Sequence, residues 1–267
     1  MSPPQKPLCQ HENGSCAACC GVYNFRDRSI DATHRRLEIR TERVKNAWPD
    51  VEKLAEVRDQ ILTEEKADIL FSTVRVCPFA GYVEEGRVGC MIHPTRHPDG
   101  EDLRDLAVYP KEVCRDHFCA PHDWLRPREV IFAQSAEGIS YGLVVTDAGL
   151  VKSLLGLLES RMHRPIRADD VADNRDALSS FWKSLLDWPF RDPDPHRFGG
   201  FLVIGDEAVE RTLPSCLAGL DVEASPAERT VLDGLGTRLQ DSDMAERALA
   251  SLRQLLDDTA QAIDEDA

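Results

Sequence analysis

The sequence contains no long hydrophobic run. Its N-terminal stretch, MSPPQKPLCQHENGSC, has no apolar segment of the kind found at the centre of a signal peptide. No window approaches the roughly 18 consecutive apolar residues that a membrane-spanning helix requires. We therefore expect a cytoplasmic protein without a membrane partner, in a compartment where reducing conditions keep cysteines as thiols.

Basic residues are too few to balance the acidic ones. The chain of 267 residues has 32 Lys and Arg against 47 Asp and Glu, which gives a formal net charge of −15. A negatively charged surface repels the phosphate backbone of DNA and RNA. No basic stripe accompanies the four tryptophans, as a base-stacking surface would require. The composition therefore argues against nucleic acid as a partner.

Common nucleotide-binding and hydrolase motifs are also missing. The sequence has no Walker-type phosphate loop, no GxSxG nucleophile elbow and no HExxH zinc helix. Glycines occur in FGGFLVIGDE (residues 198–207), but not in the GxGxxG order of a dinucleotide fold. A buried strand followed by a turn explains this segment better than a methyl-donor site.

What the sequence does contain is an uneven distribution of cysteines. Eight of the nine lie in the first 119 residues, and three of these fall within CAACC (residues 16–20). A chain of this length does not need disulfides to compensate for a small core. In a reducing compartment, clustered cysteines bind metal more often than they pair. We therefore predict a metal site formed by Cys9, Cys16, Cys19, Cys20, Cys77, Cys90, Cys114 and Cys119.

The other candidates for chemistry are weaker. Cys216 lies between apolar neighbours, where a lone cysteine is more often inert core than a nucleophile. His93 and His117 lie near cysteines in the sequence and are candidate ligands. A solvent-facing imidazole, or one that hydrogen-bonds to a ligand, explains each of them better.

The spacing within CAACC bears on the number of metal centres. Cys16 and Cys19 have the CxxC spacing that lets two sulfurs face one ion from a tight turn. Cys20 follows directly. In an extended backbone adjacent side chains point to opposite sides, so that Cys19 and Cys20 face two different centres, unless a turn reorients Cys20 for ligation. The vicinal pair therefore favours a cluster or two neighbouring ions over one ordinary four-cysteine site. Eight thiols allow two four-cysteine sites, one four-iron cluster with spare thiols, or one cluster beside a zinc ion.

The character of the sequence changes near Trp124. We expect residues 31–71 to form a helical hairpin, which breaks at Trp-Pro-Asp (residues 48–50) because proline disfavours a helical residue before it. The segments around this insert are rich in turn signals, including Glu-Gly at residues 85–86. Such irregular backbone is typical of a region held together by metal bonds. We predict a cysteine-rich metal-binding domain over residues 1–125.

The remainder, residues 126–267, is predicted to be a mainly helical region of unknown role. Apolar spacing and caps predict helices at 127–136, 148–162, 177–186 and 244–263, an ambiguous β-like segment at 139–145 and a buried strand at 198–205. The predicted class is α+β and mostly helical. It combines a loop-rich, metal-stapled cysteine region carrying a helical hairpin insert with a mixed C-terminal part.

Four elements, CAACC, CPF, GCMIHP and CRDHFC, occur in this order. Together they resemble the zinc- or iron-chelating CxxCxxCC (YkgJ-like) family. The residues that match its pattern are Cys16, Cys19, Cys20, Cys77, Pro78, Cys90, Pro94, Cys114 and Arg115. The resemblance covers about residues 9–125, although the inserts after Cys20 and Pro94 are longer here. It extends to the cysteine-rich part of flagellin lysine methylases, which are associated with an iron–sulfur cluster.

Three functional hypotheses follow. In the first, the cysteines hold zinc or iron, structurally or for storage or delivery. In the second, which the resemblance to the methylases implies, they hold an iron–sulfur cluster such as a [4Fe-4S] centre, and the C-terminal region supplies a pocket for a protein substrate. In the third, the vicinal pair of Cys19 and Cys20 is a thiol-redox sensor. The sequence does not decide whether the protein is an enzyme.

Overall fold

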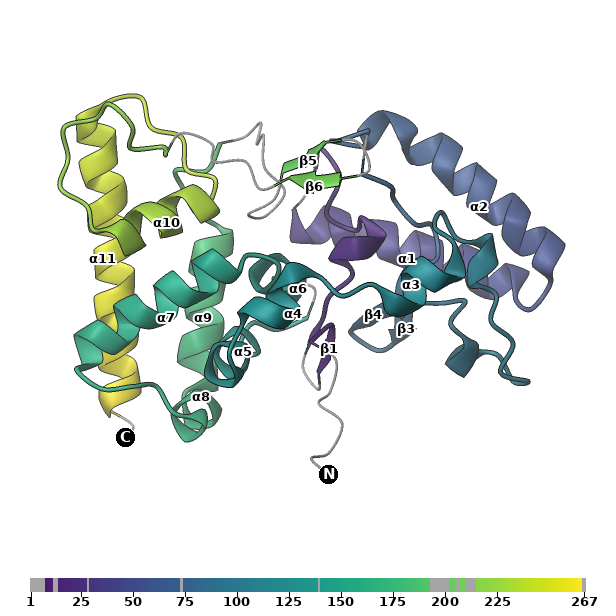
Figure 1. Cartoon of the computed structure of the whole chain (residues 1–267), viewed down its shortest axis with the longest axis horizontal. Helices are drawn as coiled ribbons and strands as arrows, with labels where there is room; N and C mark the ends of the chain where they lie inside the picture. The colour runs from purple at the N-terminus through teal and green to yellow at the C-terminus, as the bar shows by residue number, and fades with distance from the viewer. Residues whose placement is uncertain are drawn as a thin grey trace. The chain divides into compact units, whose positions relative to one another are not determined.

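The computed structural model describes residues 8–11, 14–27, 29–72, 74–138, 140–192, 202–204, 207–209 and 215–265. The chain divides into two compact units. We call residues 1–122 with 203–208 the cysteine-rich unit, and residues 123–202 with 209–267 the C-terminal unit. Helices dominate, and the strands form only small two-stranded sheets (Figure 1). The predicted class, α+β and mostly helical, is confirmed.

The predicted helical insert is a pair of helices, α1 (Ile30–Ala47) and α2 (Val51–Glu65), drawn in purple and blue in Figure 1. The Ser29 hydroxyl accepts a backbone N–H of the first turn of α1, and the Asp50 carboxylate accepts two from α2. The two helices are separated at the predicted break, residues 48–50. No described helix is both long and apolar enough to cross a membrane.

Two ion pairs of different burial link α1 to α2. The guanidinium of Arg40, only 1% exposed, forms a two-pronged pair with the Glu65 carboxylate, with Nε to Oε1 at 2.9 Å. The Arg43–Glu64 pair, with Nη1 to Oε2 at 2.7 Å, is far more exposed. Removing one partner of a buried pair leaves an uncompensated charge, so Arg40 matters more to the hairpin than Arg43.

A β-hairpin follows the helices. Strand β3 (Ala80–Glu84) pairs antiparallel with β4 (Arg87–Cys90), so that Ala80 lies opposite Cys90. The turn predicted at residues 85–86 joins the two strands. Ala80 lies three residues after Cys77, and its N–H donates to the carbonyl of Cys77 at 3.3 Å. The register therefore brings Cys90 close to Cys77 at the start of the hairpin.

The N-terminal hairpin attaches to β4. Strands β1 (Gln10–His11) and β2 (Gly14–Ser15) pair with each other. The N–H of Val88 donates to the Ser15 hydroxyl at 2.7 Å, and the Gln10 amide donates to the carbonyl of Val88 at 3.0 Å. These bonds hold the segment before CAACC beside the strand that carries Cys90.

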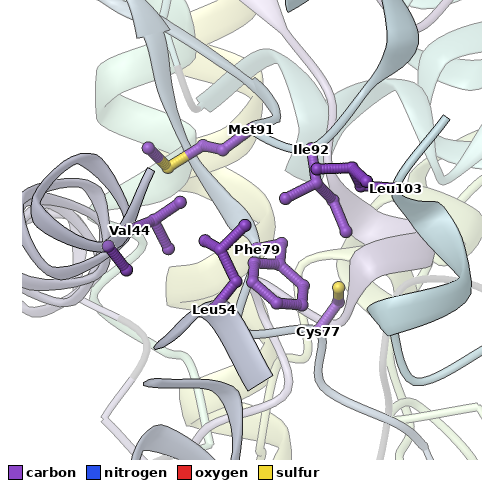
Figure 2. Close-up of a cluster of buried hydrophobic side chains, with 8 residues drawn as sticks. Val44, Leu54, Cys77, Phe79, Met91, Ile92 and Leu103 are labelled. Carbon is purple, nitrogen blue, oxygen red and sulfur yellow. The ribbon is translucent and has the colours of Figure 1, made fainter. Parts of the chain in front are cut away.

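An apolar cluster forms the core of this unit (Figure 2). Its members are Val44, Ala47, Leu54, Cys77, Phe79, Met91, Ile92 and Leu103. Phe79 lies between Leu54 and Cys77 and is fully buried. Burying a side chain of this size contributes about 1.5–3 kcal/mol. The cluster therefore fixes Cys77 from one side.

Short helices complete the cysteine-rich unit. They are η1 (Ala18–Cys20), η2 (Lys66–Asp68), η3 (Pro94–Arg96), η4 (Arg104–Leu106), α3 (Lys111–Asp116) and α4 (Ala120–Trp124), of which α4 runs past the division between the units. The second insert helix ends at Glu65, before the predicted residue 71. Ile69 instead forms an isolated β-bridge with Phe25, which requires extended backbone.

The C-terminal unit is a bundle of helices. They are α5 (Pro127–Ala133), α6 (Ser140–Val145), α7 (Ala148–Met162), α8 (Ala168–Asp173), α9 (Arg175–Leu186), α10 (Pro226–Gly234) and α11 (Ser242–Glu265). Helix α7 packs on α10 and α11. The Ser225 hydroxyl and the Glu228 carboxylate form a capping box at the start of α10. Glu228 also pairs with Arg253 of α11, with Oε1 to Nε at 2.6 Å.

One segment predicted as β-like is helical. Residues 140–145 form α6, and its Tyr141, Val144 and Val145 are buried. A short apolar run has the same pattern in a buried strand and in a buried helix, so periodicity alone could not separate the two. Of the strand predicted at 198–205, residues 202–204 form β5 (Leu202–Ile204), which pairs with β6 (Glu207–Val209). The rest of that segment lies outside the described residues.

Candidate metal centre

The N-terminal hairpin brings Cys9 to the CAACC motif. The N–H of Cys16 donates to the carbonyl of Cys9 at 2.8 Å. Helix η1 then carries Cys19 and Cys20, and Cys9 lies within electrostatic range of Cys19. Four cysteines, Cys9, Cys16, Cys19 and Cys20, are therefore gathered by one short segment.

The backbone after η1 lies directly against the segment that leads to Cys77. Gly21 has φ of +72°, and a Cβ built on it would lie 2.9 Å from Val76 Cα, with the carbonyl oxygen of Arg75 nearer still. The N–H of Cys77 donates to the carbonyl of Cys20 at 2.9 Å. Only glycine permits this close approach.

Cys77, Cys90 and Cys114 lie on the Cys20 side of the motif. Cys20 is within electrostatic range of Cys77 and Cys90. Cys114, on α3, is within range of Cys77 and Cys90 as well. Cys119, which precedes α4, instead lies within range of Cys9 and Cys16.

On the basis of this electrostatic proximity we divide the eight predicted cysteines into two groups of four. The first group consists of Cys9, Cys16, Cys19 and Cys119. The second group consists of Cys20, Cys77, Cys90 and Cys114. The groups meet at Cys19, which also lies within range of Cys20 and Cys114.

The vicinal pair joins the two groups through a thiol–thiol hydrogen bond. This bond from Cys20 lowers the pKa of Cys19 to about 7, whereas the same bond and burial raise the pKa of Cys20. Part of Cys19 reaches the surface, and Cys20 is half-buried. Both residues lie in the 3-10 helix η1, so the extended backbone considered from the sequence does not apply, and the two thiols stay within hydrogen-bonding distance of each other.

Backbone N–H groups are directed at several of the sulfurs. In three cases the donor lies two residues after the cysteine, and the bond lowers the pKa of the thiol against the opposing effect of burial. The pairs are Ala18 with Cys16, Phe79 with Cys77 and Ile92 with Cys90. A donor aimed at sulfur stabilises the thiolate, which is the form that ligates metal.

Without a metal, Cys9 and Cys90 are held in the protonated form. Burial, together with the neighbouring thiols, raises the pKa of Cys9 to about 11 and that of Cys90 to about 12. A bound cation would supply the positive charge that the buried thiolates lack, and it would displace their protons.

Two arginines lie close to the second group, and neither was identified as a candidate from the sequence. Burial raises the pKa of Cys77, and the charge of Arg40 opposes that rise; Arg40 also donates to the carbonyl of Cys77 at 3.3 Å. The buried Arg104 lies within range of Cys90 and Cys114. Both arginines favour the thiolate form of the second group.

Tyr23 was also missed. It is 2% exposed, and burial followed by the nearby Cys16, Cys19 and Cys20 raises its pKa. Its position three residues after the vicinal pair is a local signal that could have identified it.

The weaker candidates lie outside both groups. The ring of His93 hydrogen-bonds to Thr95, with Nδ1 to Oγ1 at 2.8 Å, and His117 is exposed at the end of α3. Cys216 belongs to the C-terminal unit, and its N–H donates to the Asp233 carboxylate at 2.7 Å.

The fit of a metal rests on donor chemistry. Among the described residues, no group of three or more His, Cys, Asp or Glu side chains is arranged so that it could hold a metal ion as it stands. Zinc–sulfur bonds are roughly 2.3 Å long, so an ion would have to draw the thiols of a group inward. Four soft sulfurs in each group nevertheless match zinc or iron–sulfur clusters rather than magnesium or calcium.

Comparison with known proteins identifies no relative of this chain. The chain matches no protein-family model, and no curated protein or solved structure is significantly similar to it. The likeness to the chelating family therefore stays a prediction that rests on the four cysteine-containing elements.

Proposed function

We propose that this protein binds zinc or iron through its two groups of cysteines, with four thiolates for each metal centre. The observation that carries the proposal is the sorting of eight thiols from distant segments into two groups of four. A set of four sulfurs selects zinc or an iron–sulfur cluster such as [4Fe-4S]. Two centres use every thiol, whereas a single four-cysteine site would leave four unused.

Bound metal would act as a structural element of the cysteine-rich unit. The thiols lie on or beside short elements, namely the two-residue strands β1 and β2, the three-residue η1 and the six-residue α3. Neither η1 nor α3 buries a residue of its own. Metal–sulfur bonds would supply the cohesion that packing does not.

The two alternative hypotheses, an iron–sulfur enzyme and a thiol-redox sensor, differ in how much supports them. The iron–sulfur enzyme hypothesis needs a substrate pocket that borders the cysteines. The best cavity among the described residues is lined by none of the eight. The thiol-redox hypothesis needs an accessible vicinal thiol, and the exposure of Cys19 supports it as the second candidate.

The first test is the metal content of untagged protein purified without oxygen. Colourless protein with about two zinc ions per chain supports two four-thiolate zinc sites. Brown protein with iron and acid-labile sulfide in similar amounts supports clusters. Folded, stable protein without metal refutes the proposal and leaves the thiol-redox candidate.

A matched pair of variants tests the division into groups. Cys114→Ser and Cys119→Ser lie five residues apart in short elements, one in each group, and Cys216→Ser is the control. Each single variant should lose about half of the metal, and the double variant nearly all of it. The control should keep its full content. Loss of all metal in one variant and none in the other would mean a single centre, and full retention in both would mean that neither thiol is a ligand.

A further inference from the structure

The cysteine-rich unit contains a cavity of about 130 Å³ that borders the apolar cluster and is lined by none of the eight predicted metal ligands. It lies between α1, β3 and the segment that follows β4. The lining residues are Val44, Lys45, Trp48, Tyr82, Val83, Met91 and Arg96.

The floor of the cavity is apolar. Val44 and Met91 belong to the buried cluster, and Figure 2 shows both at its edge, with the sulfur of Met91 directed toward Val44. The hairpin is held to α1 here, because the N–H of Tyr82 donates to Thr41 Oγ1 at 2.8 Å. The floor is therefore preformed, and it does not depend on a ligand for its shape.

The walls are two aromatic rings with fixed orientations. The Trp48 ring packs edge-on against His97, with the ring centroids 5.4 Å apart. The phenol of Tyr82 is hydrogen-bonded to Nδ1 of His34, and the two rings are stacked. Rings that are already ordered lose little entropy when they contact a ligand.

Two cations lie at the mouth. Lys45 and Arg96 are exposed, and neither forms an ion pair with any other residue that the structure describes. This contrasts with Arg40, Arg43 and Arg104 of the same unit, each of which pairs with a carboxylate. In a chain of net charge −15, two unpaired cations beside one cavity favour an anion.

We propose that this cavity binds a small carboxylate with an aromatic or branched apolar body. Apolar cavities of roughly 150 Å³ accommodate a benzene ring, so the floor and walls suit one ring or a short branched chain. The carboxylate would lie at the mouth between Lys45 and Arg96. A bare inorganic anion would leave the apolar floor uncovered, and a neutral ring would leave the cations unused. The proposal is independent of the metal centre.

The test is isothermal titration calorimetry of the full chain with benzoate, phenylacetate, indole-3-acetate and isovalerate, with benzamide and inorganic phosphate as comparisons. Fluorine NMR of protein labelled with 5-fluorotryptophan, assigned with Trp48→Phe, locates the site. We expect saturable binding of at least one carboxylate, a shift of the Trp48 signal, and much weaker binding of benzamide and phosphate.

Charge-removing variants complete the test. Lys45→Gln and Arg96→Gln should each raise the dissociation constant about two- to fivefold, as expected for exposed charge contacts. Lys66→Gln, an exposed lysine in the same unit but away from the cavity, should leave it unchanged. The absence of saturable binding by every carboxylate overturns the proposal. So does binding that leaves the Trp48 signal unmoved, binding that phosphate matches, or binding that a variant carrying both Lys45→Gln and Arg96→Gln retains.

Discussion

Replacing Gly21 with alanine tests how tightly the vicinal pair is fixed to the rest of its unit. An L-residue with φ of +72° costs roughly 1–2 kcal/mol. The added Cβ would also lie 2.9 Å from Val76 Cα and 3.1 Å from Val76 Cγ2, with the carbonyl oxygen of Arg75 nearer still. Backbone atoms cannot rotate away, so the two segments must separate, and overpacking of this kind costs about 1–3 kcal/mol. We expect a total loss of about 2–5 kcal/mol.

Gly86 provides a matched control. It has φ of +67°, but a Cβ there would meet nothing within 4 Å. Gly86→Ala should therefore cost only the conformational part, about 1–2 kcal/mol. Urea denaturation followed by hydrogen exchange at β3 and β4 measures the cysteine-rich unit by itself, and competition with a chelator measures metal affinity.

The close approach predicts a second effect in Gly21→Ala alone. Separating the segments displaces Cys20 from Cys77, so this variant should bind metal more weakly, whereas Gly86→Ala should bind it normally. Equal destabilisation by the two substitutions would refute the packing argument. Unchanged metal affinity in Gly21→Ala would refute the link between that contact and the second group.

Three further predictions concern charge and protons. Arg40→Met should cost about 3 kcal/mol because the largely covered Glu65 carboxylate loses its counter-charge. Arg43→Met should cost less than about 1 kcal/mol, and urea denaturation compares the two. Burial opposes ionisation of Glu228, but its partners lower its pKa to about 2, so its stabilising effect should be complete above the unfolded value of about 4.3 and lost as the pH falls toward 2. A denaturation series in acid should show this loss in the parent and not in Glu228→Gln. Because the pKa values of Cys9 and Cys90 are raised, metal binding should release protons and strengthen with pH, which calorimetry in buffers of different ionisation enthalpy detects.

Each of these three predictions can be contradicted by a specific result. Similar losses from Arg40→Met and Arg43→Met would mean that burial does not decide the strength of the pairs. A flat acid profile in the parent would contradict the lowered pKa of Glu228, and binding without proton release would contradict protonated thiols.

The helices could be predicted because their signals are local. Trp-Pro-Asp at residues 48–50 ends one helix and caps the next, and the Asp147 carboxylate caps the helix predicted at 148–162. Such motifs act through neighbouring backbone groups, so no tertiary information is needed. The segment 140–145 lacks them, and its burial on several sides came only from the fold.

The sorting of the cysteines could not be predicted, because it depends on contacts between distant segments. Cys114 and Cys119 are five residues apart, yet they lie near different groups. The backbone hydrogen bond from Cys77 to Cys20 joins segments 57 residues apart, and nothing in the local sequence encodes it. Arg104 lies within electrostatic range of the second group. It belongs to η4, in a segment whose sequence indicated only turns.

The order of the two groups along the chain has a consequence for assembly. The outermost thiols of the second group, Cys20 and Cys114, lie inside the interval from Cys19 to Cys119. Closing a loop costs conformational entropy that grows with the logarithm of its length. Once metal joins Cys20 to Cys114, the open path between Cys19 and Cys119 falls from about 100 residues to about six, which removes roughly 2.5 kcal/mol of that cost. With the proposed centres, metal binding to the second group therefore lowers the entropic cost of closing the first group. The nesting of the two groups along the chain alone favours assembly of the second group before the first.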